Sequence, residues 1–321
     1  MHAPAFTAVR LSYLVVAVVL AVFGISRAAL ADAPTGTFSV QSFQTDYFTG
    51  AATATVPIVV PKGTAGTAPQ IILTYNSTTA DDLKKTDQGQ WTGLGWTLNI
   101  GGFVLRDTKN TATTSDDMFQ LVFGGAAHGL VLIDSGQKIY HSKDDMFWKV
   151  QYFASGDYWV VTTKDGAQHR FGFNTDSKAL TLNPDLVTTV VYKYMLDQAS
   201  TTSGAQIRWA YVKQTGTAPA TGRTYDQAVY PDTITWAYTS SGAIGNLRKV
   251  QFIRGPRADW TDTSATTQTS FHRTSRLDRL EMYTGTSSLV RKYEFGYDYS
   301  IDRDPSATWG GGATARWIVL H

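Results

Sequence analysis

The chain has 321 residues, with 28 Lys and Arg against 26 Asp and Glu, and it contains no cysteine. The absence of cysteine excludes disulfide frameworks, thiol nucleophiles and thiolate metal sites. The small formal charge of +2 argues against nucleic acid or an acidic membrane as the principal partner.

Residues 1–31 are typical of an export signal. Arg10 precedes an apolar run over residues 11–25, and Ala29-Leu30-Ala31 then provides the small residues of a cleavage site. The run is short for a membrane-spanning helix, which favours cleavage over an uncleaved anchor. We therefore expect residues 1–31 to be a signal peptide cleaved after Ala31. The mature chain is then expected to be extracellular, formally neutral and without stable membrane insertion.

The acidic residues are almost all aspartate, because Glu281 and Glu294 are the only two glutamates. Glutamate favours helices, whereas aspartate favours turns and caps. Threonine, tyrosine, valine and tryptophan are frequent, as they are in strands. No long apolar pattern with a 3.6-residue period follows residue 31. The composition therefore predicts an all-β fold.

The first third of the exported chain contains alternating or apolar runs separated by turn residues. Pro61-Lys62-Gly63 and Asn76-Ser77 end two of these runs, and Gly101-Gly102 predicts a kink or bulge between two others. Residues 78–90 are polar, and we expect them to form an exposed loop. The expected strands are Ala52–Val60, Gln70–Tyr75, Trp91–Ile100 and Phe103–Arg106.

The middle third is predicted to be a series of hairpins. Its turns are Asp134-Ser135-Gly136, Ser155-Gly156-Asp157 and Lys164-Asp165-Gly166. Such residues supply the positive φ angles that tight hairpin turns need, so three of them in succession predict an antiparallel meander. The expected strands are Leu130–Ile133, Lys138–His141, Phe147–Phe153, Tyr158–Thr163 and Gln168–Phe171.

The last third continues with strands and two segments rich in Thr, Gly and Ser. Residues 214–226 and 256–270 are long enough to be surface insertions between strands. Composition does not change abruptly along the chain, so residues 32–310 are expected to form one β domain. The expected strands are Val187–Leu196, Ala205–Val212, Thr233–Tyr238, Lys249–Ile253, Leu277–Tyr283 and Val290–Tyr297.

The histidines and the search for catalytic motifs give little support for a catalytic or metal-binding site. No two histidines have the helical spacing of a zinc signature, and neither a G-x-S-x-G elbow nor a P-loop is present. His128, His141 and His169 lie in adjacent predicted hairpins and could converge, but we favour surface or cross-strand positions. We therefore predict no catalytic, cofactor-binding or metal-binding residue.

Adjacent carboxylates occur at Asp81-Asp82, Asp116-Asp117 and Asp144-Asp145. None of these pairs has the alternating spacing of a calcium loop, so we interpret them as solvated turns. An Asp pair could also serve sugar hydrolysis, but aspartate is too frequent here to support that function.

Nine Trp and 16 Tyr allow a carbohydrate-binding interpretation in which rings stack on sugars. Trp159, Trp209 and Trp236 instead lie within alternating strands beside apolar neighbours. We therefore predict that these rings pack in the core or against a sheet face.

A series of short motifs resembles one family of bacterial proteins. Between residues 50 and 96 they follow the order of the N-terminal signature of plasmid virulence B proteins, toxin-complex B components and RHS-repeat wall or secreted proteins. Residues 158–166 and 194–197 continue the likeness, although Gly204-Ala205 stands where a full YD-type unit has Gly-Asn. The motifs are Gly50-Ala51-Ala52, Val56-Pro57-Ile58-Val59-Val60-Pro61, Gly63-Thr64-Ala65-Gly66, Pro69, Leu73-Thr74-Tyr75-Asn76-Ser77 and Gly93-Leu94-Gly95-Trp96.

This resemblance implies a hollow β-shell whose strands spiral around a space that holds a C-terminal, often toxic region. The chain would then be a curved sheet of such a shell, non-enzymatic, whose partner is the rest of an RHS/toxin-complex-like chain or a partner shell protein. Family members are usually much longer, so residues 311–321 are expected to be the tail of a truncated or frame-shifted product. We expect self-association through its last, unpaired strand edge.

Two other classes of function are alternatives. A free-standing extracellular module for carbohydrate or a cell-wall polymer requires an exposed cleft lined by coplanar Trp or Tyr rings. A glycoside-acting enzyme requires two Asp carboxylates that face each other across a cleft. A shell segment requires neither, and its aromatic side chains should pack against other strands.

Overall fold

The computed structural model describes residues 41–320, except 46–48, 64–65, 82–87, 240, 258–270, 286, 303–307, 310–312 and 315. The chain divides into two compact units, and the second, Val40–His321, contains every described residue. The predicted signal peptide and its cleavage site lie outside the described residues. Within the described part, no helix is long and apolar enough to cross a membrane.

A four-stranded antiparallel sheet begins the described chain, in the order β1-β2-β3-β4. Along β2 the side chains alternate, with Ala54 and Val56 buried, which is the period of a half-buried strand. The strand ends at Pro57, where the missing N–H costs no ladder hydrogen bond. The strands are β1 Gln41–Thr45, β2 Ala52–Pro57, β3 Ile72–Asn76 and β4 Trp96–Asn99.

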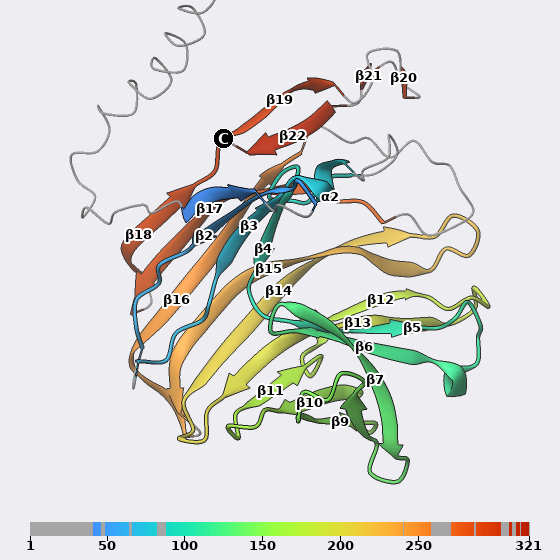
Figure 1. Ribbon diagram of the computed structural model, residues 1–321. Helices are drawn as coiled ribbons and strands as arrows, with labels where there is room; N and C mark the ends of the chain where they lie inside the picture. The colour runs from blue at the N-terminus through green and yellow to red at the C-terminus, as the bar shows by residue number, and fades with distance from the viewer. Residues whose placement is uncertain are drawn as a thin grey trace, which may run out of the picture. The chain divides into compact units, whose positions relative to one another are not determined.

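The larger sheet has 14 strands, and each of its pairings is antiparallel (Figure 1). Strands β5 to β11 each pair with the next one along the chain, as the hairpin turns predicted. The all-β, antiparallel fold class is therefore confirmed. The bounds are β5 Phe103–Asp107, β6 Met118–Phe123, β7 Ala126–Asp134, β8 Ile139–Ser142, β9 Lys149–Phe153, β10 Tyr158–Thr162 and β11 Gln168–Phe171.

Strand β13 (Thr189–Ser200) closes β5 to β11 into a ring of eight strands. It pairs with β5 through residues 193–195 and with β11 through residues 196–200. Strand β12 (Lys178–Leu182) lies beside β13 without belonging to the ring. The closing contacts join parts of the chain that no local sequence signal connects.

The glycines predicted to form a kink lie where the chain passes from the small sheet into the ring. A Cβ atom at Gly101, whose φ is 151°, would lie 2.7 Å from Leu196 Cδ2. A Cβ atom at Gly102 would collide with the carbonyl oxygen of Val122. The Leu196 amide donates to the Gly102 carbonyl at 3.0 Å. Glycine therefore lets β5 run close to β13 and β6 at this junction.

Strands β14 to β18 continue from β13 as an open sheet, with β14 pairing to β13 at residues 198–200. β15 was expected to begin at Thr233 but extends back through Pro231. Its pairing with β16 starts only at Thr233, so Pro231 interrupts no ladder on that side. The bounds are β14 Gln206–Thr217, β15 Thr224–Thr239, β16 Gly242–Pro256, β17 Ser275–Thr284 and β18 Ser288–Glu294.

One sequence prediction about a loop is wrong. Residues 214–226 are mostly strand, because β14 extends to Thr217 and β15 begins at Thr224. The segment 78–90, predicted as an exposed loop, begins with one helical turn, α2 (Thr78–Asp81), and residues 82–87 lie outside the described residues. Its Gly89 is buried, and the Arg257 guanidinium donates to the Gly89 carbonyl at 3.0 Å. Most of the predicted loop 256–270 lies outside the described residues.

The last described strands form two small pairs. β19 (Tyr297–Asp302) pairs with β22 (Arg316–Leu320), and β20 (Thr308–Trp309) pairs with β21 (Ala313–Thr314). The predicted tail, residues 311–321, therefore contains a paired strand instead of an unpaired apolar end.

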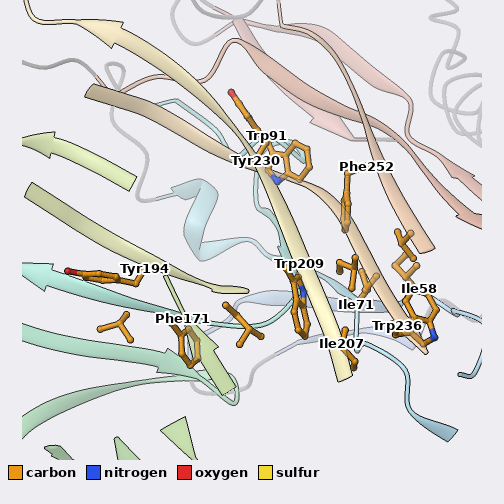
Figure 2. Packing of buried hydrophobic residues seen from close by; sticks show 14 of the residues in the cluster. Ile58, Ile71, Trp91, Phe171, Tyr194, Ile207, Trp209, Tyr230, Trp236 and Phe252 are labelled. Carbon is orange, nitrogen blue, oxygen red and sulfur yellow. The ribbon is translucent and has the colours of Figure 1, made fainter. Parts of the chain in front are cut away.

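One apolar cluster connects the small sheet, the ring and the open sheet (Figure 2). Ile58 and Ile71 lie near Trp236 of β15. Trp91 follows the small sheet's third strand in sequence, and its ring lies 5.6 Å from Tyr230 and 6.4 Å from Phe252, centroid to centroid. Full burial of each such side chain contributes about 1.5–3 kcal/mol. The small sheet therefore belongs to the same core as the open sheet.

Candidate functional site

The three tryptophans predicted for the core are buried. Trp159 and Trp236 are fully buried, and Trp209 is 5% exposed. The indole of Trp236 donates to the carbonyl of Pro61 at 3.1 Å, and that of Trp209 donates to the carbonyl of Ile100 at 2.8 Å. The core prediction is confirmed, and the rings of Trp159 and Trp236 present no exposed face on which a sugar could stack.

An aromatic cluster fills the interior of the ring. The Trp159 ring on β10 lies 4.8 Å from Phe119, 5.0 Å from Tyr140, 4.8 Å from Tyr152 and 6.3 Å from Tyr194, centroid to centroid. Because these residues come from five strands of one closed ring, the cluster must point inward. The buried indole N–H of Trp159 has no hydrogen-bond partner within the described residues, a cost of about 1–3 kcal/mol.

One carboxylate bonds two hydroxyls of this cluster. Tyr152 and Tyr194 donate to Asp157 Oδ1 at 2.9 and 2.7 Å, and Lys178 Nζ lies 3.3 Å from Asp157 Oδ2. Burial first, and then the bond to negatively charged Asp157, raise the pKa of both tyrosines above the ordinary value. The sequence indicated Asp157 only as a turn residue, but its side chain orders the ring interior.

A second carboxylate, Asp197 on β13, is fully buried and accepts four hydrogen bonds. The donors are Arg170 Nε at 2.6 Å, the amides of Phe173 and Asn174 at 2.6 and 3.2 Å, and Ser177 Oγ at 3.1 Å. They hold the connection between β11 and β12. A carboxylate whose two oxygens are occupied in this way positions backbone and is not available as a general acid or base.

The three histidines of the predicted hairpins do not converge. His128 is buried, with Nδ1 2.5 Å from Asp144 Oδ2, whereas His141 is exposed. His169 packs against Phe123 at 4.6 Å between ring centroids, and burial lowers its pKa. The described part of the chain contains no cluster of three His, Asp or Glu residues that could hold a metal. Of the three, His141 lies at the surface, whereas His128 also packs against Trp148 at 5.1 Å between ring centroids.

Three of the adjacent aspartates bond to other side chains. Asp117 accepts from Arg106 Nε at 2.6 Å, and Asp116 accepts from Thr111 at 3.0 Å. Asp144 bonds His128, as described above. Of the pair Asp81-Asp82, the second residue lies outside the described residues. Asp116, Asp117 and Asp144 are therefore engaged within the fold.

The two glutamates also bond within the open sheet. Glu281 accepts from Arg279 Nε and from the Tyr283 hydroxyl, both at 2.6 Å. Glu294 accepts from Lys292 at 2.8 Å, and it lies opposite Arg279 in the β17–β18 register. Each carboxylate thus has a cationic neighbour and does not face the other across a cleft.

A cavity of about 440 Å³ lies at the junction of the small sheet, the ring and β14. Ile100, Phe123, His169 and Trp209 belong to its lining. Within the described residues, no Asp or Glu lines it, so it lacks the carboxylate pair that glycoside hydrolysis requires. A second cavity, of about 540 Å³, lies beside β13, and Lys193, Gln227 and Arg273 belong to its lining.

Solved structures share this fold. The crystal structure of TcdB2-TccC3 matches with a TM-score of 0.55 and 17% identity, over 83% of this chain and 15% of that chain. The structure of the Photorhabdus luminescens Tc holotoxin pore matches with a TM-score of 0.54 and 16% identity, and the match covers 89% of this chain and 15% of that chain. The N-terminal domain of the effector protein SpvB from Salmonella typhimurium matches with a TM-score of 0.51 and 14% identity, and the match covers 76% of this chain and 93% of that domain. The chain has the fold of these proteins.

The sequence itself is distant from known proteins. No family model and no curated protein matches it significantly. The chain spans about 15% of the length of the TcdB2-TccC3 chain, whereas its match covers 93% of the SpvB domain. The resemblance seen in the sequence motifs is therefore supported at the level of an RHS/toxin-complex-like fold.

Proposed function

We propose that this chain is a non-catalytic structural segment of a secreted, RHS/toxin-complex-like β-shell that encloses or carries a C-terminal effector region. The observation that carries the proposal is the fold shared with a 15% segment of TcdB2-TccC3. The partner is then the rest of such a chain or a partner shell protein, and the location is extracellular.

The end of the open sheet supports this proposal. The strand order ends at β18, which pairs with β17 and with no other described strand. An outermost strand of this kind presents backbone donors and acceptors along its free edge. A further strand from a longer shell would satisfy these groups.

The polar side chains support the non-catalytic part. Hydrogen bonds from side chains or backbone of the fold itself engage the carboxylates of Asp157, Asp197 and Glu281. Together they stabilise turns, a ring interior and a strand pair. The free-standing carbohydrate module gains no support from Trp159, Trp209 or Trp236, since all three are buried.

The test is co-expression of this chain with the product of the reading frame that follows it in the genome. We expect the two products to copurify, with the effector region protected from limited proteolysis. A chain that stays alone as a monomer and binds a polysaccharide saturably would overturn the proposal in favour of a binding module.

The non-catalytic part has its own test, which is a screen on polysaccharide, ester and peptide substrates. We expect no turnover above background. Hydrolysis that disappears when one Asp or His is changed would contradict this part of the proposal.

A further inference from the structure

The cavity of about 540 Å³ beside β13 lies where the ring meets the open sheet. Phe103 of β5, Lys193 of β13 and Val229 of β15 line it. The segment Phe271–Arg273, which precedes β17, completes the lining. Thr181 of β12 also belongs to the lining, so four strands that hold their backbones by ladder hydrogen bonds form most of a preformed pocket.

Two cationic side chains, Lys193 and Arg273, are part of this lining. Lys193 Nζ lies over the Phe103 ring, 3.9 Å from its centroid, which stabilises the ammonium group in part. Neither cation forms an ion pair with a carboxylate of the described residues, in contrast to Arg106, which is paired with Asp117 in the ring. The pocket thus holds two positive charges whose counter-charge is missing within the described fold.

Asp226, the carboxylate whose charge acts on the cavity residue Tyr192, already has other partners. Asp226 Oδ2 accepts from the Leu180 amide at 2.7 Å and from Lys213 Nζ at 3.0 Å. Its charge is felt at Tyr192, where burial first and Asp226 second raise the pKa to about 12. Asp226 therefore neutralises Lys213 and leaves Lys193 unbalanced.

Two glutamine side chains fix the backbone on which Arg273 is carried. The Arg273 amide donates to Gln88 Oε1 and Gln88 Nε2 donates to the Arg273 carbonyl, both at 2.6 Å. Gln214 Nε2 donates to the His272 carbonyl at 3.1 Å, and its Oε1 accepts from the Thr274 amide at 3.0 Å. These bonds replace a strand partner, so Arg273 is held in place although it lies outside a strand.

A nearby positive charge destabilises the charged form of each of these two cations. Burial first and the charge of Arg273 second lower the pKa of Lys193 to about 8. Burial first and the charge of Arg257 second lower the pKa of Arg273. Partly buried like charges are unfavourable unless an anion balances them.

We propose that this cavity binds a small oxyanion, a phosphate or a carboxylate, between the ammonium group of Lys193 and the guanidinium group of Arg273. The planar guanidinium matches two oxygens of such an anion, and the ammonium adds a point charge. Thr181 and Gln227, which also line the cavity, carry further hydrogen-bond donors. The site is independent of the shell role, because its lining comes entirely from this chain.

The test is isothermal titration calorimetry of the full chain with sodium phosphate and, separately, sodium succinate, against sodium chloride at equal ionic strength. We expect saturable heat with at least one of the two oxyanions, and the one that binds identifies the source. Lys193→Met and Arg273→Met should each weaken binding by at least about tenfold, because each removes a charged donor. Lys149→Met and Arg223→Met, at exposed positions, serve as controls and should bind like the parent chain.

Folding and binding can be separated in this experiment. Without added oxyanion, Lys193→Met should melt at or above the parent temperature, because it removes a like-charge contact and keeps an apolar chain against Phe103. Phosphate should raise the melting temperature of the parent chain and leave that of Lys193→Met unchanged. Equal effects of phosphate, succinate and chloride, or unchanged binding in both cavity variants, would overturn the proposal.

Discussion

The ring and the open sheet differ in how the edges of their strands are satisfied. In the ring, β5 to β11 and β13 each have two neighbours, so the sheet has no free edge. The open sheet ends at β18, which pairs only with β17 among the described strands. Closure gives the ring an interior that its own side chains can fill, whereas the open sheet is covered on one face by the small sheet. The two regions therefore depend on different contacts for stability.

The interiors differ in the same sense. In the ring, Tyr152 and Tyr194 bond Asp157, so these two hydroxyls of the aromatic cluster find their acceptor within the ring. In the open sheet, the indole of Trp236 bonds the carbonyl of Pro61, which lies outside that sheet. The ring is thus largely self-contained, and the open sheet relies on another layer.

The largest effect on the free energy of unfolding is expected from replacing Trp159 in the ring or Trp236 in the open sheet. Trp159→Ala should lower the free energy of unfolding by about 3–5 kcal/mol, because it leaves a cavity among aromatic rings. Trp159→Phe should cost less than Trp236→Phe, since only the Trp236 indole donates a hydrogen bond. Denaturant unfolding followed by circular dichroism measures each difference. A larger loss for Trp159→Phe would contradict the contrast between the two interiors.

Asp197→Asn is expected to have the next largest effect. The substitution leaves Arg170 without its carboxylate and disturbs the turn after β11, so we expect a loss of about 2–3 kcal/mol. Asp144→Asn is the matched control. Asp144 also bonds a side chain, that of His128, but it is exposed instead of buried. Thermal melting at neutral pH compares the two variants, and equal losses would mean that burial of Asp197 contributes nothing.

Alkaline pH should destabilise the ring through its tyrosines. Below an ordinary pKa of 10.0, Tyr152 and Tyr194 are neutral in both states. Above it the unfolded chain loses these protons first, so stability falls as pH rises toward the raised pKa values of the folded state. The double variant Tyr152→Phe and Tyr194→Phe should lose less stability between pH 9 and 11. Melting temperatures across this range test the expectation, which an unchanged slope would exclude.

The smallest effect is expected at the free edge of β18. We predict concentration-dependent self-association, and Val290→Lys, at a residue 36% exposed, should reduce it by adding a charge to that edge. Val131→Lys in β7, at 44% exposure, is the control, because β7 has two neighbours. Size-exclusion chromatography with light scattering reports the mass. Deletion of residues 315–321 should reduce association only in part, and a stable monomer at high concentration would favour the free-standing module.

Local signals predicted the parts of the fold that depend on local chemistry. The turns at 134–136, 155–157 and 164–166 determine their own hairpins, and alternation placed Trp159 in the core. Ring closure was not predictable in the same way, because Leu105 and its partner Lys193 are far apart in sequence. The continuation of β15 through Pro231 depends on where the neighbouring ladder begins, which the sequence of β15 does not show.

The candidate functional residues were missed for a similar reason. Asp157 and Gln88 look like ordinary turn or loop residues in the sequence, and Asp197 is marked only by the family likeness of residues 194–197. Their partners lie as much as 185 positions away, as in the bonds between Gln88 and Arg273. A polar residue whose partner is distant gives no spacing signal, so only the fold identifies it.

The closure of the ring by β13 determines the order in which the chain can fold during synthesis. β5 is made long before residues 193–195, with which it must pair, and β6 to β11 form their hairpins in between. The small sheet shares its core with β15, β16 and β17, so it reaches its final packing later still. Contacts of such long sequence separation slow folding. A nascent chain would therefore stay without a completed core until most of its length had been synthesised.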